Sequence, residues 1–251
     1  MRFILLAAGL AVVLAGQSTP APRPITVSAA VSLTDALTAI ANDYGAAGRG
    51  AVRFNFGASN ILARQIVEGA PVDVFVSADD LQMDVVARAG LIAEGSRVEV
   101  TGNTLVLVAD PRSTIKTIDD LGSADVRRIA IGDPAAVPAG VYARRYLEDI
   151  GMWARLEPKL VPTTSVRAAL TAVENGSATA AFVYATDAKV APALRIVATI
   201  AGPRAPRIVY PACVVKTTRQ PAAAARFLQF LRTPVAAAIL ARHGFAPPAA
   251  R

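Results

Sequence analysis

Short runs of β-branched and aromatic residues alternate with longer helical stretches through the first part of the chain. Residues 25–29 form the first such run, and residues 33–44 carry apolar side chains at helical spacing. The same order continues in two further strand and helix pairs, at residues 53–56 with 61–68 and 73–77 with 81–89. Strands that alternate with helices join as parallel neighbours. This pattern therefore predicts an α/β fold in which helices flank mainly parallel sheets.

A second set of alternating runs fills the middle of the chain, so two lobes are expected. Strands are predicted at residues 105–109, 128–132, 180–184 and 195–200, with helices at 142–150 and 166–173. A last strand at 208–215 and helices at 222–231 and 235–242 close the chain. We expect lobe I to comprise residues 25–102 plus 205–251, and lobe II residues 103–204. The crossings near 101–104 and 201–207 would then act as hinge strands, with a ligand cleft between the lobes.

The N-terminus has the pattern of a secretory signal peptide. Arg2 precedes an apolar run at residues 3–15, and small residues follow it. This run is shorter than the roughly 20 residues that a membrane-spanning helix needs. Residues 19–24 are rich in proline and predict an extended spacer, so residues 1–24 are assigned to signal and spacer. We therefore expect a protein exported to the periplasm, with no cysteine after the apolar run to carry a lipid.

Composition excludes several kinds of chemistry. Cys213 is the only cysteine, which rules out an intramolecular disulfide and a thiolate metal cluster, and its apolar surroundings predict a buried strand thiol. The formal net charge is +7, but the basic residues are scattered and do not alternate with aromatics, so nucleic-acid binding is not indicated. His243, the only histidine, follows the last predicted helix and reads as a helix-terminal cation. No phosphate-binding loop, nucleophile elbow or metal-ligand spacing occurs, so we expect neither catalysis nor a cofactor.

Four predicted helix starts carry the residues that could bind a ligand. Ser32 opens what resembles a capping box, and Ser59 precedes the second helix. Pro138 opens a helix in the second half, and a Thr/Ser run ending at Ser165 precedes Val166. Helix starts expose unpaired N–H groups and the positive end of the helix dipole, which together bind anions. Each start alone is more often an ordinary cap, and the pattern is specific to no particular anion.

Six segments together resemble the molybdate-binding proteins of bacterial ABC transporters, in the same order and at compatible spacing. They span nearly all of the chain after the spacer and lie at residues 27–33, 56–66, 69–79, 132–140, 165–170 and 183–188. The resemblance implies a two-lobed periplasmic-binding-protein fold of the clamshell type, with a tetrahedral oxyanion held between the lobes. It also implies capture of molybdate or tungstate and delivery to the permease of an ABC transporter, by a monomer that catalyses nothing.

The resemblance also implies which residues contact the oxyanion. Ser32 and Ser59 would donate from their hydroxyls and backbone N–H groups, Ala139 and Val166 from their backbone N–H groups. Tyr184 would donate from its phenolic hydroxyl, and it is implied by the resemblance alone. Molybdenum would be held only through the oxygens of molybdate, with no direct metal ligation.

Other functions stay open on sequence alone. Sulfate, phosphate or another oxyanion would suit the same helix starts. An exported hydrolase could combine Ser59 or Tyr184 with His243, and a sensor or adhesion role could use the same fold.

Overall fold

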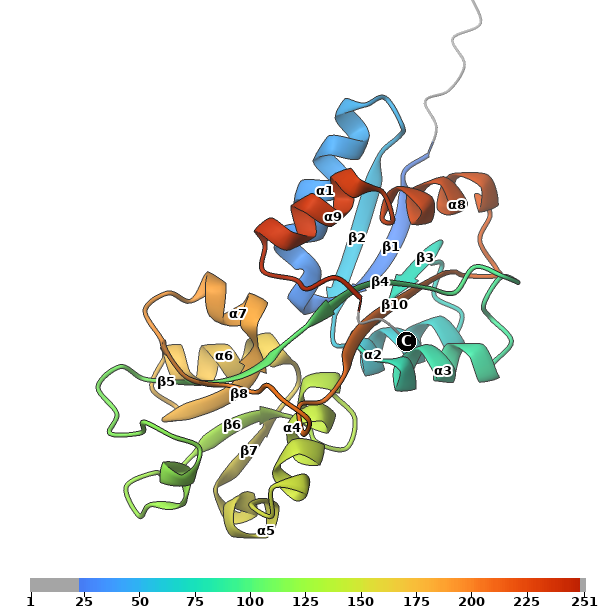
Figure 1. Cartoon of the computed structure of the whole chain (residues 1–251). Helices are drawn as coiled ribbons and strands as arrows, with labels where there is room; N and C mark the ends of the chain where they lie inside the picture. Colours follow the sequence, from blue (N-terminus) through green and yellow to red (C-terminus); the bar gives the residue numbers. More distant parts are fainter. Residues whose placement is uncertain (1–22, 249–251) are drawn as a thin grey trace, which may run out of the picture.

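The alternating runs of the sequence form two separate five-stranded sheets, each flanked by helices (Figure 1). The computed structural model describes residues 23–248. Residues 1–22, which make up most of the segment predicted as signal peptide and spacer, lie outside the described residues. Taking each sheet with its helices as a lobe, the predicted two-lobed α/β fold is confirmed.

Lobe I has the strand order β2-β1-β3-β10-β4. Its strands are β1 (Ile25–Ala30), β2 (Val52–Gly57), β3 (Val74–Val76), β4 (Val98–Asn103) and β10 (Ile208–Val214). Its helices are α1 (Thr34–Ala46), α2 (Ser59–Val67), α3 (Asp80–Arg88), α8 (Pro221–Phe230) and α9 (Pro234–Arg242), with the 3-10 turn η1 (Val31–Leu33) between β1 and α1. Both ends of the described chain therefore belong to this lobe.

Lobe II has the strand order β7-β6-β8-β5-β9. Its strands are β5 (Leu105–Ala109), β6 (Ile129–Gly132), β7 (Leu160–Thr163), β8 (Ala180–Tyr184) and β9 (Arg195–Thr199). Its helices are α4 (Pro138–Asp149), α5 (Trp153–Leu156), α6 (Val166–Glu174) and α7 (Ala185–Val190), with 3-10 turns η2 (Asp119–Gly122) and η3 (Glu157–Lys159). The lobe is one continuous stretch of chain.

Each sheet is mixed, with one reversed strand. In lobe I, β1 pairs in parallel with β2 and β3, while β10 is antiparallel to both β3 and β4. In lobe II, β6 pairs in parallel with β7 and β8, while β5 is antiparallel to both β8 and β9. The reversed strand in each sheet is the first one that the chain enters after crossing from the other lobe.

The two crossings lie at the paired strands β4 and β10, which run between the lobes in Figure 1. Thr104 alone separates β4 from β5, and residues 200–207 separate β9 from β10. The first crossing thus falls in a strand at the predicted position, whereas the second crossing, predicted as a hinge strand at 201–207, is a loop. The exact lobe boundaries at 102/103 and 204/205 stay a prediction.

The core consists of the inward faces of the sheets and the helices packed on them. All residues of β8 and β10 are buried, as a strand covered on both faces requires. Cys213 lies in β10 and is completely buried, and burial raises the pKa of its thiol to about 12, which confirms the prediction of a buried strand thiol.

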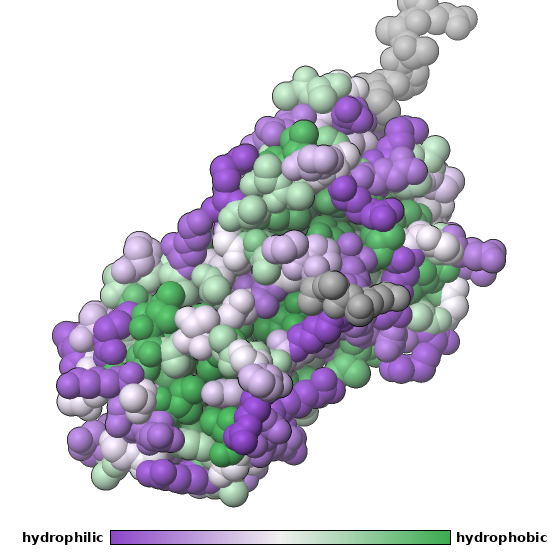
Figure 2. Space-filling view, in the orientation of Figure 1, coloured by the Kyte–Doolittle hydropathy of each residue, from purple (hydrophilic) through white to green (hydrophobic). Residues whose placement is uncertain are grey.

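Figure 2 shows hydrophilic side chains spread over both lobes on one face, with smaller apolar areas between them. In the described range, no helix by itself is long and apolar enough to span a membrane; α8 and α9 meet that measure only together, with a 61° bend between them.

Several local predictions need correction. The sequence did not predict β7, α5 or α7. These elements have four, four and six residues, and elements so short do not show a period. Helix α2 begins earlier than predicted, at Ser59, whereas α4 begins at Pro138, the residue predicted to open it. Ser32 is not a helix cap: it lies in η1, the cap of α1 is Leu33, and no side chain caps that helix.

Candidate functional site

The ends of several strands surround one small cavity between the lobes. Lobe I contributes the end of β1 with η1, the end of β2 with the start of α2, and Ala78 between β3 and α3. Lobe II contributes the starts of α4 and α6 and the end of β8. The lining residues are Ala30, Val31, Ser32, Gly57, Ala58, Ser59, Ala78, Val137, Pro138, Ala139, Val166 and Tyr184. The structure therefore brings together all five residues that the sequence singled out as ligand contacts, although their contact with a ligand stays a prediction.

The cavity is small. Its volume is about 10 Å³, which is the space of about one water molecule. A sugar, peptide or nucleotide would not fit with the lobes in this position. The occupant that suits the cavity is thus a compact ion or molecule that both lobes can contact at once.

Three α-helices begin at the cavity wall. Ser59 is the first residue of α2, and Ala139 is the second residue of α4, after Pro138. Val166 is the first residue of α6, whose cap Ser165 accepts a hydrogen bond from the N–H of Ala168 at 3.1 Å. The first four N–H groups of a helix have no partner within that helix, and the helix dipole makes this end positive. The cavity is therefore surrounded by backbone donors from both lobes.

A close backbone contact positions the start of α4. A Cβ atom on Gly140 would lie 1.9 Å from the carbonyl oxygen of Gly132, the last residue of β6. Only glycine permits this approach, because any side chain would overlap the strand backbone. The contact holds the N–H of Ala139 at the cavity.

Both serine hydroxyls are buried and already accept or share a hydrogen bond. The Oγ of Ser59 accepts from the backbone N–H of Ala78 at 3.0 Å. The Oγ of Ser32 lies 2.9 Å from the phenolic oxygen of Tyr210 in β10. Since Ser59 uses its oxygen as an acceptor for Ala78, its own proton is available to an occupant of the cavity.

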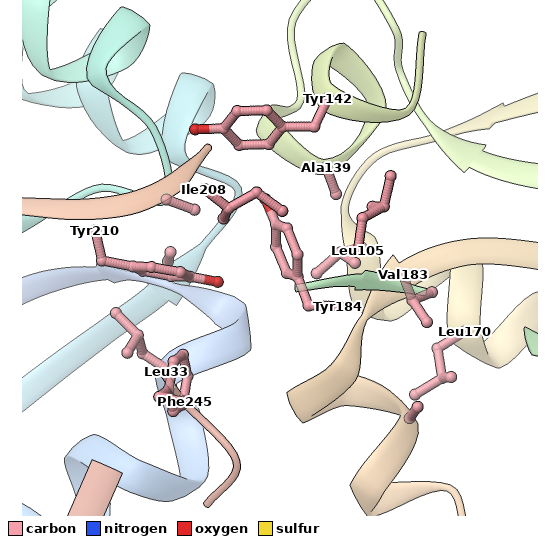
Figure 3. Packing of buried hydrophobic residues seen from close by; sticks show 14 of the residues in the cluster. Leu33, Leu105, Ala139, Tyr142, Leu170, Val183, Tyr184, Ile208, Tyr210 and Phe245 are labelled. Carbon is pink, nitrogen blue, oxygen red and sulfur yellow. The ribbon is translucent and has the colours of Figure 1, made fainter. Parts of the chain in front are cut away.

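Tyr184 brings the most informative single atom of the site. It is the last residue of β8, its side chain is 1% exposed, and its hydroxyl has no hydrogen-bond partner among the described residues. Burial raises the pKa of Tyr184 well above its usual range, so the hydroxyl stays neutral and can donate. Figure 3 shows the rings of Tyr142, Tyr184 and Tyr210 gathered between the lobes. A buried hydroxyl without a partner costs free energy, so this atom indicates where an occupant would accept a hydrogen bond.

Charged side chains do not line this cavity, as far as the described residues go. Two carboxyl groups lie behind it, and burial raises the pKa of each. Asp79 caps α3, and its pKa is raised to about 6 although the N–H of Gln82 opposes the shift. Burial raises the pKa of Asp187 in α7 to about 6, although the ion pair with Arg167 opposes this shift. The cavity thus offers neutral donors, and an occupant must supply the acceptors.

Several polar contacts join the lobes, among them an ion pair and a hydrogen bond. The Nη2 of Arg167 in α6 lies 2.8 Å from the Oδ2 of Asp35 in α1. The Nε2 of Gln82 in α3 donates to the carbonyl oxygen of Ala136 at 3.3 Å. Both contacts join lobe I to lobe II, so they stabilise the closed arrangement in which the cavity exists.

His243 lies apart from the cavity. It caps the C-terminal end of α9, as the sequence reading expected, and lines a different cavity beside Asp35 and Arg167. Ser59 and Tyr184 therefore lack a histidine partner in the site, so the geometry gives the hydrolase hypothesis no general base. Within residues 23–248 no group of three or more His, Cys, Asp or Glu side chains could hold a metal ion.

Sequence reasoning missed three contributors to the site. Ala78 lines the cavity and donates to Ser59, and Tyr210 contacts Ser32 from the other end of the chain. Asn103 donates to the hydroxyl of Tyr210 at 3.1 Å. The only signal was the isolated polar position of Tyr210 in an otherwise apolar strand, which alone does not name a partner.

Comparison with known proteins adds a consistent set of likenesses. The family model described as bacterial extracellular solute-binding protein matches residues 25–246. The chain is 38% identical to the molybdate-binding protein ModA of Escherichia coli over 244 residues, which cover 95% of each protein. The solved structure of the periplasmic molybdate-binding protein of Azotobacter vinelandii superposes with a TM-score of 0.81 at 27% identity, over 90% of this chain and 100% of that one. The sulfate-binding protein SubI of Mycobacterium tuberculosis shares the fold, with a TM-score of 0.78 at 20% identity over 89% of this chain and 86% of that one.

Proposed function

The chain belongs to the family of bacterial extracellular solute-binding proteins, and on that premise we propose that it captures molybdate between its lobes for uptake by an ABC transporter. Two molybdate-binding relatives, from Escherichia coli and Azotobacter vinelandii, match it over nearly its whole length. It is a binding protein and not an enzyme. Tungstate, a tetrahedral dianion like molybdate, is proposed as a second ligand of the same site.

The observation that carries this proposal is a small cavity between the lobes that no charged side chain among the described residues lines and that the unpartnered Tyr184 hydroxyl borders. Ser32 and Ser59 would contribute hydroxyl and backbone N–H groups, Ala139 and Val166 backbone N–H groups, and Tyr184 its unpartnered hydroxyl. A dianion with four oxygens can accept from every side, and hydrogen bonds to a charged acceptor are stronger than those between neutral groups. Molybdenum would be bound through these oxygens alone, with no direct metal ligation and no cofactor.

The proposed mechanism is capture, closure and delivery. With the lobes apart, the helix starts of each lobe would be open to solvent and attract the anion. Closure would bring Ala139 and Val166 against Ser32 and Ser59 and exclude water. The closed protein, acting as a monomer in the periplasm, would then present both lobes to the membrane permease. Selectivity over sulfate would come from cavity size, since both ions are tetrahedral dianions.

A thermal-shift assay of the exported form with molybdate, tungstate, sulfate and phosphate tests the ligand. A ligand at 100 times its Kd adds about 2.7 kcal/mol of stability. For a chain of this size that raises Tm by roughly 5–10 °C. We expect this rise with molybdate and tungstate. A rise with sulfate or phosphate alone would keep the fold and replace the ligand, and no rise with any of the four would contradict oxyanion binding.

The Ser59→Ala variant tests the site itself. We expect molybdate binding to weaken by about 1.5–3 kcal/mol, the range for a hydrogen bond to a charged group. Ser96→Ala is the matched control, because Ser96 also bonds backbone groups of lobe I but lies away from the cavity. Titration calorimetry of both variants gives the comparison. Equal affinities for Ser59→Ala and the unchanged protein would remove Ser59 from the site.

A further inference from the structure

A hydrogen-bond relay runs from the crossing between the lobes to the cavity. It comprises Thr104, Asn103, Tyr210 and Ser32, joined by distances of 2.8 Å, 3.1 Å and 2.9 Å in that order. Asn103 and Tyr210 are both buried, and Tyr210 does not line the cavity. The relay therefore reaches the candidate site only through Ser32.

The direction of the relay is fixed at its first member. The backbone N–H of Thr104 can only donate, so the side-chain atom of Asn103 that faces it must be the oxygen Oδ1. The amide nitrogen of Asn103 then points the other way. It donates to the hydroxyl of Tyr210 and, at 2.9 Å, to the Oγ1 of Thr186 in lobe II.

Tyr210 consequently has one role left for its own proton. Its oxygen accepts from Asn103, and its side chain is completely buried. If Ser32 donated to Tyr210, the phenolic proton would be left buried without a partner, which is the costlier arrangement. Tyr210 therefore donates to Ser32, and the proton of Ser32 is left available to an acceptor in the cavity, which Ser32 lines.

We infer that Tyr210, oriented by Asn103, is a positioning residue that fixes the Ser32 hydroxyl as a donor to the bound oxyanion. This inference rests on the proposed function and adds to it a device for specificity. With Tyr210 donating to Ser32 and Ala78 donating to Ser59, both hydroxyls face the cavity as donors. Such a site favours an anion whose oxygens all accept, and it disfavours hydrogen phosphate, whose P–OH group needs an acceptor.

A double-mutant cycle tests the inference. Tyr210→Phe keeps the ring, which packs edge-on against Phe245 with centroids 5.4 Å apart, and removes only the hydroxyl. We expect the molybdate Kd to rise about fivefold, the effect of about one hydrogen bond. In a Ser32→Ala background the same change should raise Kd less than about twofold, because Tyr210 acts through Ser32. Relative binding of hydrogen phosphate should increase in Tyr210→Phe.

Tyr44→Phe is the matched control. Tyr44 is also buried in lobe I and packs edge-on against Phe227, but it is no part of the relay. The molybdate Kd of Tyr44→Phe should equal that of the unchanged protein. Asn103→Asp is the second variant. A carboxylate cannot donate to Tyr210, so the direction of the hydrogen bonds in the relay reverses and molybdate affinity should fall. Part of this fall in affinity should disappear in the Ser32→Ala background.

The outcomes separate this inference from the proposed function. If Tyr210→Phe weakens molybdate binding equally in the unchanged and Ser32→Ala backgrounds, or does not weaken it at all, the relay is overturned while molybdate binding stands. Failure of the unchanged protein and of Tyr44→Phe to bind molybdate would instead overturn the ligand. The cycle would then be run with whichever oxyanion stabilises the protein, since the relay does not depend on the central atom.

Discussion

Tyr184 and Tyr210 are two buried tyrosines, 6.1 Å apart between ring centroids, whose hydroxyls differ in what they contact. The hydroxyl of Tyr210 has both Ser32 and Asn103 as partners. The hydroxyl of Tyr184 has none among the residues that the structure describes. Removing the Tyr210 hydroxyl should cost the unliganded protein hydrogen bonds, whereas removing the Tyr184 hydroxyl should cost it none.

We therefore expect Tyr184→Phe to leave the unliganded protein as stable as before or slightly more stable. Its free energy of unfolding should not fall, because the variant loses an unpaired polar group from a buried site. Molybdate affinity should fall by about 1.5–3 kcal/mol, since the lost hydroxyl would donate to a charged ligand. Urea unfolding and calorimetry measure the two effects. A variant that unfolds more easily yet binds as before would show that Tyr184 is structural.

Residue-level prediction from the sequence succeeded where the signal was local. Ser165 caps α6 three residues before its partner Ala168, and Pro138 opens α4, both as local rules predict. Ser32 also looked like a cap, but its hydroxyl instead contacts Tyr210, 178 residues away. Tyr184 came only from family resemblance. No local pattern could supply the contacts of Ser32 and Tyr184, because their surroundings are assembled from distant strands.

Helix α4 illustrates how an element is placed by one backbone contact. Its third residue, Gly140, packs against the end of β6 so closely that a Cβ would overlap the carbonyl of Gly132. In an unobstructed helix, alanine is better than glycine by roughly 0.5–1 kcal/mol. Packing should reverse that preference here.

We expect Gly140→Ala to destabilise the protein by about 1–3 kcal/mol, the usual cost of forcing atoms into a filled space. The shifted helix start should also weaken molybdate binding through Ala139. Gly45→Ala in α1 is the control, because its Cβ would meet only an ordinary contact at 3.8 Å, with the carbonyl of Gly50. Chemical denaturation should show opposite signs for the two variants. The same sign for both would mean that the α4 contact is not restrictive.

The elements themselves were largely predictable. Long periodic helices such as α1 and the buried apolar strands β5 and β8 were found within a residue or two of their ends. The elements β7, α5 and α7 were missed, since each is too short to show a period. The strand order was not predictable either, because β10 enters the lobe I sheet between β3 and β4, far from both in sequence.

At the scale of the whole molecule, the ion pair between Asp35 and Arg167 joins the two lobes at 2.8 Å. The Asp35 side chain is partly open to water, so the pair contributes little energy, about 0.2–1 kcal/mol. Arg167 also holds Asp187 within lobe II. Because the pair with Asp35 joins the two lobes, we expect its contribution to appear in ligand binding.

We expect Asp35→Asn to raise the molybdate Kd by up to about fivefold at low salt, mainly through faster release. The difference from the unchanged protein should shrink as salt is added, because exposed ion pairs are screened. Glu148→Gln is the control, since Glu148 forms a similarly exposed pair with Arg144 inside lobe II. Stopped-flow measurement of the rate of molybdate release at two salt concentrations tests this prediction. A salt-independent loss, or an equal loss in the control, would contradict the inter-lobe role.

The topology also sets an order of assembly for a chain that emerges N-terminus first. Lobe II is one uninterrupted stretch, so its five strands can pair as soon as β9 has emerged. Lobe I begins first, but β10, which joins β3 to β4 in its sheet, is made only after all of lobe II. The closing of that long loop is entropically costly and delays the pairing. The first lobe to be translated is therefore the last to be completed, and until then β3 and β4 each leave an edge open that a premature partner could occupy.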